Sequence, residues 1–158
     1  MYVNKSKTGY GDVWMTPPDL AQRIVQHFAP EGECLDPARG DGAFYNAFPG
    51  AKDWCEVTEG RDFLTWTKPT DWIITNPPWS IMRKFLNKAF SLSSNVVLLV
   101  PIYHAFTSAR YRDMLKHGFG IKEICLVQPP PTFPVMGFMI AAIHWEKNYF
   151  GPIQISNL

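Results

Sequence analysis

The chain has 158 residues and a mass of 18.0 kDa, enough for one hydrophobic core and too little for a second sizeable domain. Hydrophobic residues make up 46% and charged residues 18%, as in an ordinary globular protein, and the net charge of +1 excludes strong general attraction to polyanions. The polar N-terminus lacks a signal-peptide core and no apolar run could cross a bilayer, so we expect a cytoplasmic protein without membrane contact.

Residues 1–15 contain few apolar side chains and predict a flexible lead-in to a single domain that spans residues 1–158. A helix is expected next, because Thr16 can be its N-cap and Pro17 its first residue. Apolar residues then recur at helical spacing as far as Pro30, where we expect the helix to end.

A short apolar strand at Cys34 and Leu35 leads into the sequence Asp36-Pro37-Ala38-Arg39-Gly40-Asp41-Gly42-Ala43-Phe44. The two glycines permit positive φ and close approach of the backbone to a ligand, and the helix beyond them presents free N–H groups. A strand, an acidic residue, Gly-x-Gly and a helix in this order predict a loop that binds a nucleoside-type cofactor. No Lys-Ser or Lys-Thr pair follows the glycines, which excludes a P-loop.

The next predicted strand covers residues 54–57. Glu56 follows Asp36 by 20 positions, where an acidic residue can reach the ribose hydroxyls of a bound nucleoside. Asp62 can accept a hydrogen bond from an adenine amino group while Phe63 packs beside the ring. The structural alternatives are a surface glutamate on an edge strand, and a turn aspartate next to a core phenylalanine.

Residues 71–79 predict a buried strand that stops at Asn76-Pro77-Pro78-Trp79. The prolines fix φ and cannot donate to a sheet, so they hold Asn76 rigidly at the carboxyl end of the strand, where α/β sheets bind ligands. An amide oxygen and a peptide carbonyl can accept both hydrogens of an NH2 group and aim the nitrogen lone pair at an electrophile. Trp79 offers a face for stacking a base; alternatively, it is a core residue after a proline-rich turn.

Four further elements follow from hydrophobic periodicity. They are an amphipathic helix, a buried parallel strand and two final strands, at residues 81–92, 95–100, 121–127 and 138–145 respectively. No internal repeat interrupts this order.

The segment at residues 103–112 mixes basic and aromatic side chains and begins on the same edge of the sheet as Asn76. This placement makes His104, Arg110 and Arg112 candidate contacts for phosphates and bases, although a solvated helix face is nearly as good an interpretation. Phe133, in the proline-rich link before the last strand, is the candidate for the other side of a base slot. A polyproline ligand for a partner protein is the alternative for this link.

The three cysteines and four histidines are scattered along the chain without metal-ligand spacing. We therefore expect no metal site. Cys34, Cys55 and Cys125 are expected to be buried thiols in a reducing compartment.

Taken in order, these motifs resemble those of the S-adenosylmethionine (SAM)-dependent amino methyltransferases of the adenine-N6 DNA type. The resemblance covers most of the chain, from about residue 16 to the last predicted strand. It implies an α/β fold of class I: a Rossmann-like three-layer sandwich with a mostly parallel sheet and an antiparallel last strand. Asp71 follows Glu56 by only 15 positions, so the part between strands 2 and 4 of the family is reduced.

The resemblance also implies roles for individual residues. Those that would bind SAM are Thr16, Pro17, Asp36, Pro37, Gly40, Gly42 and Phe44 around the methionine part, Glu56 at the ribose, and Asp62 with Phe63 at the adenine. Asn76 Oδ1 and the Pro77 carbonyl would accept hydrogen bonds from the target amine, with Pro78 and Trp79 completing the catalytic motif. Because the sulfonium methyl is already activated, positioning supplies most of the catalysis and no metal is required.

The implied reaction is methyl transfer to N6 of adenine in DNA after base flipping. RNA adenine is the alternative substrate, since related motifs occur in enzymes that methylate RNA adenine, RNA guanine and glutamine side chains. A non-catalytic cofactor-binding subunit or decoy is the third possibility. The chain ends at Leu158 without a separate target-recognition domain, as in a small phage- or prophage-type enzyme. A second copy of the chain or a separate partner is then expected to read the target sequence.

Overall fold

The computed structural model describes residues 14–134 and 137–158, so almost all of the predicted lead-in lies outside the described residues. The helices are α1 (Pro18–Phe28), α2 (Ala43–Ala47), α3 (Met82–Leu92) and α4 (Ser108–Lys116). The strands are β1 (Cys34–Asp36), β2 (Lys52–Trp54), β3 (Trp72–Thr75), β4 (Asn95–Pro101), β5 (Phe119–Val127), β6 (Ile140–Lys147) and β7 (Gln154–Asn157). Four 3-10 helices lie between them: η1 (Val57–Glu59), η2 (Phe63–Thr65), η3 (Trp79–Ile81) and η4 (Ile102–Ala105).

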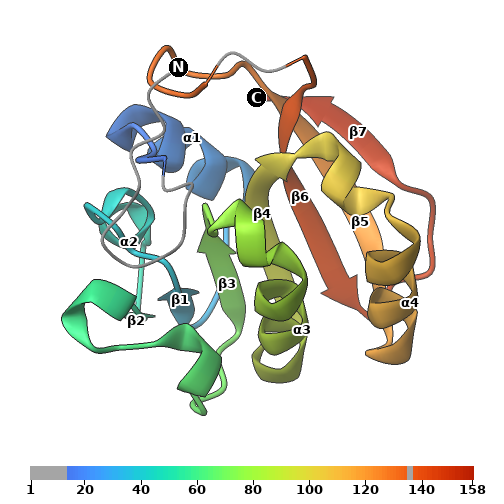
Figure 1. Cartoon of the computed structure of the whole chain (residues 1–158), viewed down its shortest axis with the longest axis horizontal. Coiled ribbons are helices and arrows are strands. Elements are labelled where there is room, and N and C mark those ends of the chain that lie inside the picture. Colours follow the sequence, from blue (N-terminus) through green and yellow to red (C-terminus); the bar gives the residue numbers. More distant parts are fainter. Residues whose placement is uncertain (1–13, 135–136) are drawn as a thin grey trace.

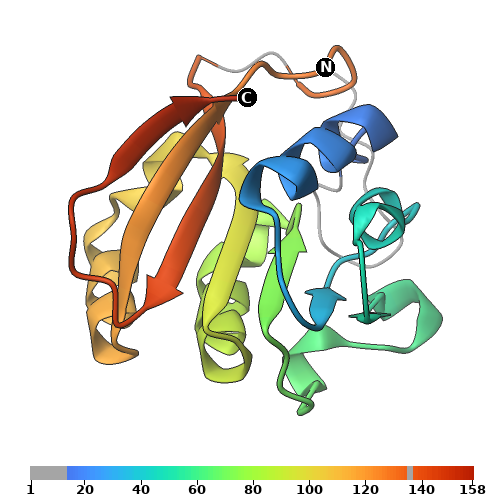
Figure 2. The same ribbon diagram turned by 180° about the vertical axis from the view of Figure 1, so that it is seen from behind.

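The described strands form one sheet in the order β2-β1-β3-β4-β6-β5-β7 (Figure 1). The pairs from β2 to β4 are parallel, whereas β6 is antiparallel to both of its neighbours, β4 and β5. The predicted mostly parallel sheet with an antiparallel strand is confirmed, and that strand is the one expected at residues 138–145. A further strand, β7, follows it and pairs in parallel with β5 at the edge of the sheet (Figure 2). Its four residues are too few to show a strand pattern in the sequence.

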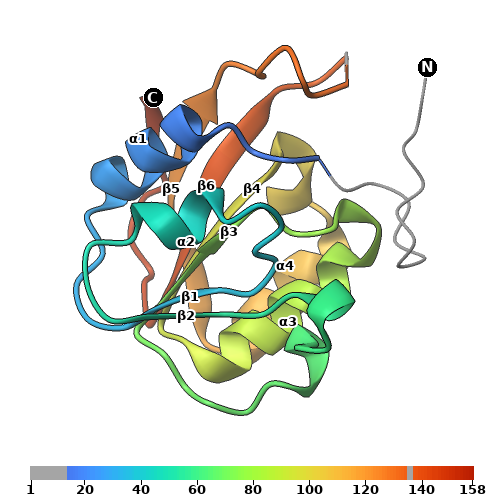
Figure 3. The same ribbon diagram turned by 90° about the vertical axis from the view of Figure 1, so that its left-hand side faces the viewer.

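Helices cover the sheet on both faces, which confirms the three-layer sandwich. Figure 3 shows α1 and α2 on one side of the sheet and α3 and α4 on the other. Strand β4 lies in the middle of both core layers, because Val96 and Leu98 pack towards α3 whereas Val97 packs towards α1. This explains its unbroken apolar sequence.

Two boundaries differ from the sequence predictions. Strand β2 ends at Trp54, so the strand expected at residues 54–57 was placed too late in the chain. The part after it is reduced as expected, to η1 and η2. The N-cap of α1 is Pro17 rather than Thr16, because the Thr16 hydroxyl accepts a hydrogen bond from Asn76 and is not used to cap the helix.

The three cysteines are buried and free, as expected. Burial raises the pKa of the Cys34 thiol to about 11 and that of the Cys55 thiol to about 12, so both are protonated and inert at neutral pH. Across residues 14–134 and 137–158, none of the helices combines the length and the apolar character needed to cross a membrane.

Candidate functional site

The order of strands creates a switch point between β1 and β3. From β1 the chain moves outward to β2 on one side and returns to β3 on the other side, so the segments that follow β1 and β3 diverge at the carboxyl edge of the sheet. Ligands of open α/β sheets bind in the crevice at such a point. A cavity of about 340 Å³ lies there, lined by residues from both segments.

The cavity brings together most of the residues that the sequence motifs singled out. The predicted residues that line it are Thr16, Pro37, Gly40, Phe44, Glu56, Asp62, Phe63, Asn76, Pro77 and Pro78. Four of the predicted cofactor-binding and catalytic residues do not line it: Pro17, Asp36, Gly42 and Trp79. Other lining residues were not predicted, among them Trp14, Met15, Arg39, Thr58, Ile81 and Phe85. The spacing of Ile81 and Phe85 along one helical face was a signal, but it indicated a core position equally well.

The glycine turn has the backbone shape that its sequence predicted. Gly40 has φ of +51° and Gly42 has φ of +90°, both in the left-handed region that favours glycine. A Cβ atom on Gly40 would lie 2.8 Å from Met15 Sδ, so a side chain at residue 40 would crowd the entrance from the N-terminal segment. The Gly40 N–H points to Glu56, to which it donates a hydrogen bond of 3.0 Å.

Asp36 holds the glycine turn from beneath. Its carboxylate is fully buried and accepts hydrogen bonds from the Thr75 hydroxyl (2.7 Å) and the N–H groups of Ala38 (3.4 Å) and Tyr45 (3.1 Å). Burial raises its pKa to about 6 in spite of these bonds. Asp36 does not line the cavity, and its contact with a cofactor stays a prediction. The hydrogen bond from Thr75 to Asp36 links the end of β3, just before Asn76, to the end of β1, just before Pro37.

Glu56 is held at the far side of the cavity by three donors. Its Oε1 accepts from the N–H (3.1 Å) and hydroxyl (2.7 Å) of Thr58, and its Oε2 accepts from Gly40. Burial alone would raise the Glu56 pKa, but these hydrogen bonds outweigh it and lower the pKa below the usual range. A carboxylate that stays ionised and has free lone pairs can accept bonds from two vicinal hydroxyls.

Asp62 and Phe63 lie beside Glu56 on the wall of the cavity. Asp62 Oδ1 accepts from the Leu64 N–H at 2.9 Å and thereby caps η2. The Phe63 ring packs 4.5 Å from the Phe85 ring, measured between centroids, at an angle of 44°. Asp62 is thus a turn aspartate and Phe63 a core phenylalanine, as in the structural alternatives. Both residues also line the cavity.

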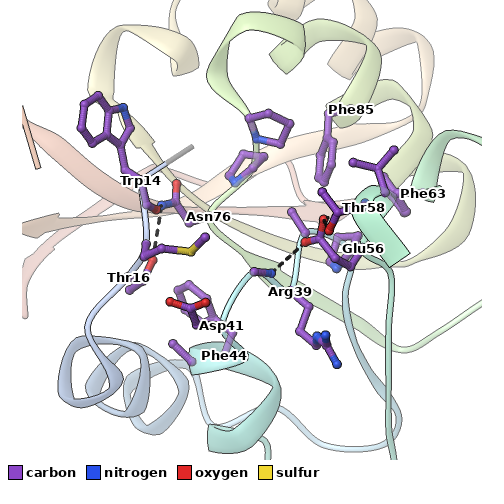
Figure 4. A pocket seen from close by; sticks show the side chains of 18 of the residues that line it. Trp14, Thr16, Arg39, Asp41, Phe44, Glu56, Thr58, Phe63, Asn76 and Phe85 are labelled. Carbon is purple, nitrogen blue, oxygen red and sulfur yellow. Dashed lines mark hydrogen bonds between the residues drawn. The ribbon is translucent and has the colours of Figure 1, made fainter. Parts of the chain in front are cut away.

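Asn76 lies at the side of the cavity opposite Glu56 (Figure 4), and its amide is fixed at both ends. The amide nitrogen donates to the Trp14 carbonyl (2.7 Å) and to Thr16 Oγ1 (3.3 Å). The amide oxygen accepts from the Trp79 indole N–H at 3.2 Å, and the same N–H also points to the Leu99 carbonyl. These bonds orient Oδ1, which keeps one lone pair for another donor.

Trp79 has a different contact from the one predicted. Its ring is half-buried between the two core layers, does not line the cavity, and meets the Phe133 ring edge-on at 6.2 Å between centroids. In this arrangement the indole orients the Asn76 amide. Stacking of Trp79 on a target base stays a prediction.

The remaining substrate candidates do not form a common surface. His104 and Phe133 are buried, so neither is available for the solvent-side contact that the sequence suggested. Burial and the charge of Arg110 lower the His104 pKa to about 4, so its ring is neutral at pH 7. Arg110 is half-buried and donates to Thr107 Oγ1 at 2.9 Å, whereas Arg112 is exposed on α4. Only Arg112 therefore fits the expected role without rearrangement.

One group of possible metal ligands lies elsewhere, among the described residues. Atoms of His27, Glu123 and Cys125 lie within 4.8 Å of one another between α1 and β5. Glu123 already accepts hydrogen bonds from His27 Nε2 (2.6 Å) and from Ser156 (2.5 Å). These bonds account for the grouping as a contact that ties α1 and β7 to β5.

No protein-family model matches the chain, and no curated protein matches its sequence. Solved structures, however, match its fold. A proposed RNA methyltransferase, PH1948, from Pyrococcus horikoshii superimposes with a TM-score of 0.64 at 16% identity, over 90% of this chain and 91% of that one. Magnesium protoporphyrin IX methyltransferase (ChlM) from Synechocystis PCC 6803, solved with bound SAM, gives 0.61 at 13% identity over 87% of each chain.

The M protein of the type I restriction enzyme EcoKI gives a TM-score of 0.66 at 13% identity over 92% of this chain. This chain spans 46% of that protein. The architecture is thus that of the class I SAM-dependent methyltransferases. This confirms the predicted fold class. The names of these three structures indicate different substrates, so the fold by itself does not specify what is methylated.

Proposed function

We propose that this protein transfers a methyl group from SAM to the N6 amine of adenine in DNA. The observation that carries the proposal is that Asn76-Pro77-Pro78 and the Gly40 turn line one cavity. The cavity fits a nucleoside-type cofactor, because it combines a glycine turn with positive φ, an ionised carboxylate at Glu56 and a further acceptor at Asp62. The fold neighbours, one of them with bound SAM, support the choice of cofactor.

In this proposal Glu56 accepts hydrogen bonds from the ribose hydroxyls, while Asp62 and Phe63 contact the cofactor adenine. The backbone of the Gly40 turn approaches the methionine part closely, and Asp36 holds that turn in place through Ala38 and Tyr45. When bound, SAM supplies an electrophilic methyl group on a sulfonium. The chain needs only to place a nitrogen in line with it.

Asn76 Oδ1 and the Pro77 carbonyl would do this by accepting the two hydrogens of the target NH2 group. The free lone pair of Oδ1 is available for this bond, because Trp79 uses only one side of the oxygen. Two fixed acceptors favour the pyramidal amine, whose lone pair then points at the methyl carbon. The new N–C bond would form as the methyl–sulfur bond breaks, and the sulfur would leave as a neutral thioether. An amide oxygen is not a base at neutral pH, so the surplus proton then leaves to water.

The test is incubation of the protein with tritiated SAM and an equal mixture of DNA, RNA and protein, followed by nucleoside analysis. Label in N6-methyladenine of DNA supports the proposal. Label confined to RNA or protein, with DNA unlabelled, contradicts the choice of substrate. Binding of SAM by calorimetry without transfer to any acceptor contradicts catalysis and favours a cofactor-binding subunit. Some of the fold neighbours are parts of type I restriction-modification systems. They support a nucleic-acid substrate and a partner protein for this chain.

Methylation of adenine in RNA is the second candidate. The specific observation in its favour is the proposed RNA methyltransferase from Pyrococcus horikoshii, which this chain matches over nearly the whole of both proteins. The same incubation separates the two, because N6-methyladenosine and its deoxy form are resolved by chromatography.

A further inference from the structure

Four large apolar side chains gather at the carboxyl edge of the sheet, outside the residues predicted for substrate. Tyr103 is 45% and Phe106 61% exposed in and beside η4, and Phe138 is 40% and Met139 44% exposed just before β6. We call these four residues the rim platform. A soluble protein rarely exposes neighbouring aromatic side chains of this size without a use for them.

Two contacts hold the halves of the rim platform together. The Ile102 N–H donates to the Met139 carbonyl at 2.9 Å, which joins η4 to the segment before β6. The Tyr103 and Phe138 rings meet edge to face, with 5.1 Å between centroids and an angle of 85°. The rings are thus presented on an ordered backbone, and stacking on them does not require a loop to fold first.

The rim platform lies over β4, which neighbours the strand that leads to Asn76 on the side away from the glycine turn. Strand β4, which leads into η4, lies next to β3, whereas the glycine turn follows β1 on the other side of β3. Trp79 spans the same interval, since its indole N–H points to both Asn76 Oδ1 and the Leu99 carbonyl of β4. In the proposed reaction the target nitrogen attacks the methyl carbon from the side opposite the sulfur. If the cofactor lies over β1, the target base therefore enters from the side of β4.

The charges near this surface do not suit a duplex. DNA duplexes are bound largely by cations that neutralise phosphates. Here the net charge is +1, Arg110 is half-buried against Thr107, and Arg83 is paired with Asp113 at 2.7 Å, which leaves Arg112 as the exposed candidate among the predicted phosphate contacts. The rim platform instead offers aromatic area, and only bases that are not stacked within a duplex can use it.

We propose that the rim platform binds unpaired nucleotides, so that the substrate is single-stranded DNA around the target adenine. The inference rests on the proposed function for the choice of DNA and for the direction of approach. It adds that bases flanking the target stack on Tyr103, Phe106 and Phe138. Target adenines in a continuous duplex are then poor ligands.

The test is fluorescence anisotropy with a labelled adenine-containing strand of about 12 nucleotides, which is within the site size of such surfaces, and with its matched duplex. We expect the single strand to bind at least about 10-fold more tightly than the duplex. Tyr103→Ala and Phe106→Ala should each weaken binding of the single strand by about 5-fold or more, as for the loss of one stacked base. Phe106→Trp should keep the affinity.

The matched control is Phe150→Ala. Phe150 is 77% exposed in the connection from β6 to β7, at the other end of the sheet, and its removal should leave binding unchanged. Equal or tighter binding of the duplex, or wild-type affinity of both alanine variants, overturns the inference. Tighter binding of the same sequence as single-stranded RNA overturns the assignment to DNA.

A transfer assay on the same strands keeps this inference apart from the proposed function. Methylation of duplex DNA with no binding of single strands contradicts the inference about the rim platform and supports the proposed methyl transfer to DNA. Binding of single strands that depends on Phe106, with no methyl transfer to them, keeps the binding surface and contradicts the function.

Discussion

The sequence indicates functional residues over both halves of the carboxyl edge of the sheet, more strongly over β1 and β3 than over β4, and only the candidates over β1 and β3 line a common cavity. Over β1 and β3, the glycine turn, Glu56 and Asn76 line one cavity. Over β4, His104 and Phe133 are buried and Arg110 is held by Thr107. The aromatic side chains that are exposed there, Tyr103 and Phe106 among them, had not been selected.

The difference shows which kinds of sequence motif predict the position of a residue in the folded protein. The motifs over β1 and β3 act through the backbone, since glycine and proline restrict φ wherever the chain takes them. The candidates over β4 were chosen for side-chain chemistry alone, and that chemistry counts only if the side chain reaches solvent. Four predictions test this contrast.

The largest effect is expected from Asn76→Ala. Loss of the oriented amide oxygen should lower the rate of methyl transfer by about 100-fold or more, as for removal of a donor or acceptor used in the transition state. The affinity for SAM should fall much less than the rate, because the amide holds Trp14 and Thr16 at one side of the cavity, whereas Glu56 and the Gly40 turn are held by other hydrogen bonds. Single-turnover kinetics and calorimetry measure the two quantities. Asn46→Ala, an exposed asparagine of α2, is the control, and a rate within 10-fold of wild type would refute the role of Asn76.

Asp36→Asn should change how stability depends on pH. Burial raises the pKa of Asp36 in the folded protein to about 6, above the ordinary aspartate value of 3.8, so the folded protein binds this proton more tightly than the unfolded chain. The resulting stabilisation is fully present below about pH 4 and is lost as the pH rises through 6, by on the order of 3 kcal/mol. An asparagine does not titrate, so this dependence should vanish in the variant.

Urea unfolding of the wild type and of Asp36→Asn at pH 4.5 and pH 7 measures the effect of Asp36 as a difference, so that other titrating groups cancel. Asp41→Asn, at an exposed carboxyl in the same turn, should show the wild-type dependence. A wild-type-minus-variant stability difference that is the same at both pH values would show that burial does not control Asp36.

Glu56→Gln is expected to weaken SAM binding by about 10-fold or more, because hydrogen bonds to a charged acceptor contribute about 1.5–3 kcal/mol. The bonds from Gly40 and Thr58 depend on the same carboxylate, so part of the loss comes from a looser glycine turn. Calorimetry with SAM measures the affinity. Glu31→Gln, at an exposed position away from the cavity, serves as the control, and unchanged affinity for Glu56→Gln would reject the ribose contact.

The smallest effect is expected from Arg112→Ala, the one predicted substrate contact over β4 that is exposed. A single lost phosphate contact should weaken binding of a DNA strand by a few-fold and reduce the slope of log affinity against log salt by about 0.7. Lys116→Ala, near the other end of α4, should leave the slope unchanged. A slope as steep in Arg112→Ala as in the wild type would show that Arg112 belongs to a solvated helix face and does not contact phosphate.

By itself, the sequence determined the order and type of most elements and the two turns that frame the cavity. The apolar run of β4, the strand before Asn76 and the helix at residues 81–92 were predictable because they depend on periodicity within a few residues. The positive φ of Gly42 and the stop at Pro77 were predictable for the same reason: the residue itself restricts the backbone.

Only the tertiary structure decided which side chains face the cavity. Asp36 belongs to the predicted motif but lies beneath the turn, because the Thr75 hydroxyl reaches it from another strand. Trp79 donates to Asn76 and Leu99 and so takes an orienting place that its sequence neighbours do not indicate. Exposure and hydrogen bonding depend on residues distant in the chain, and a single sequence does not specify how those distant residues pack around one side chain.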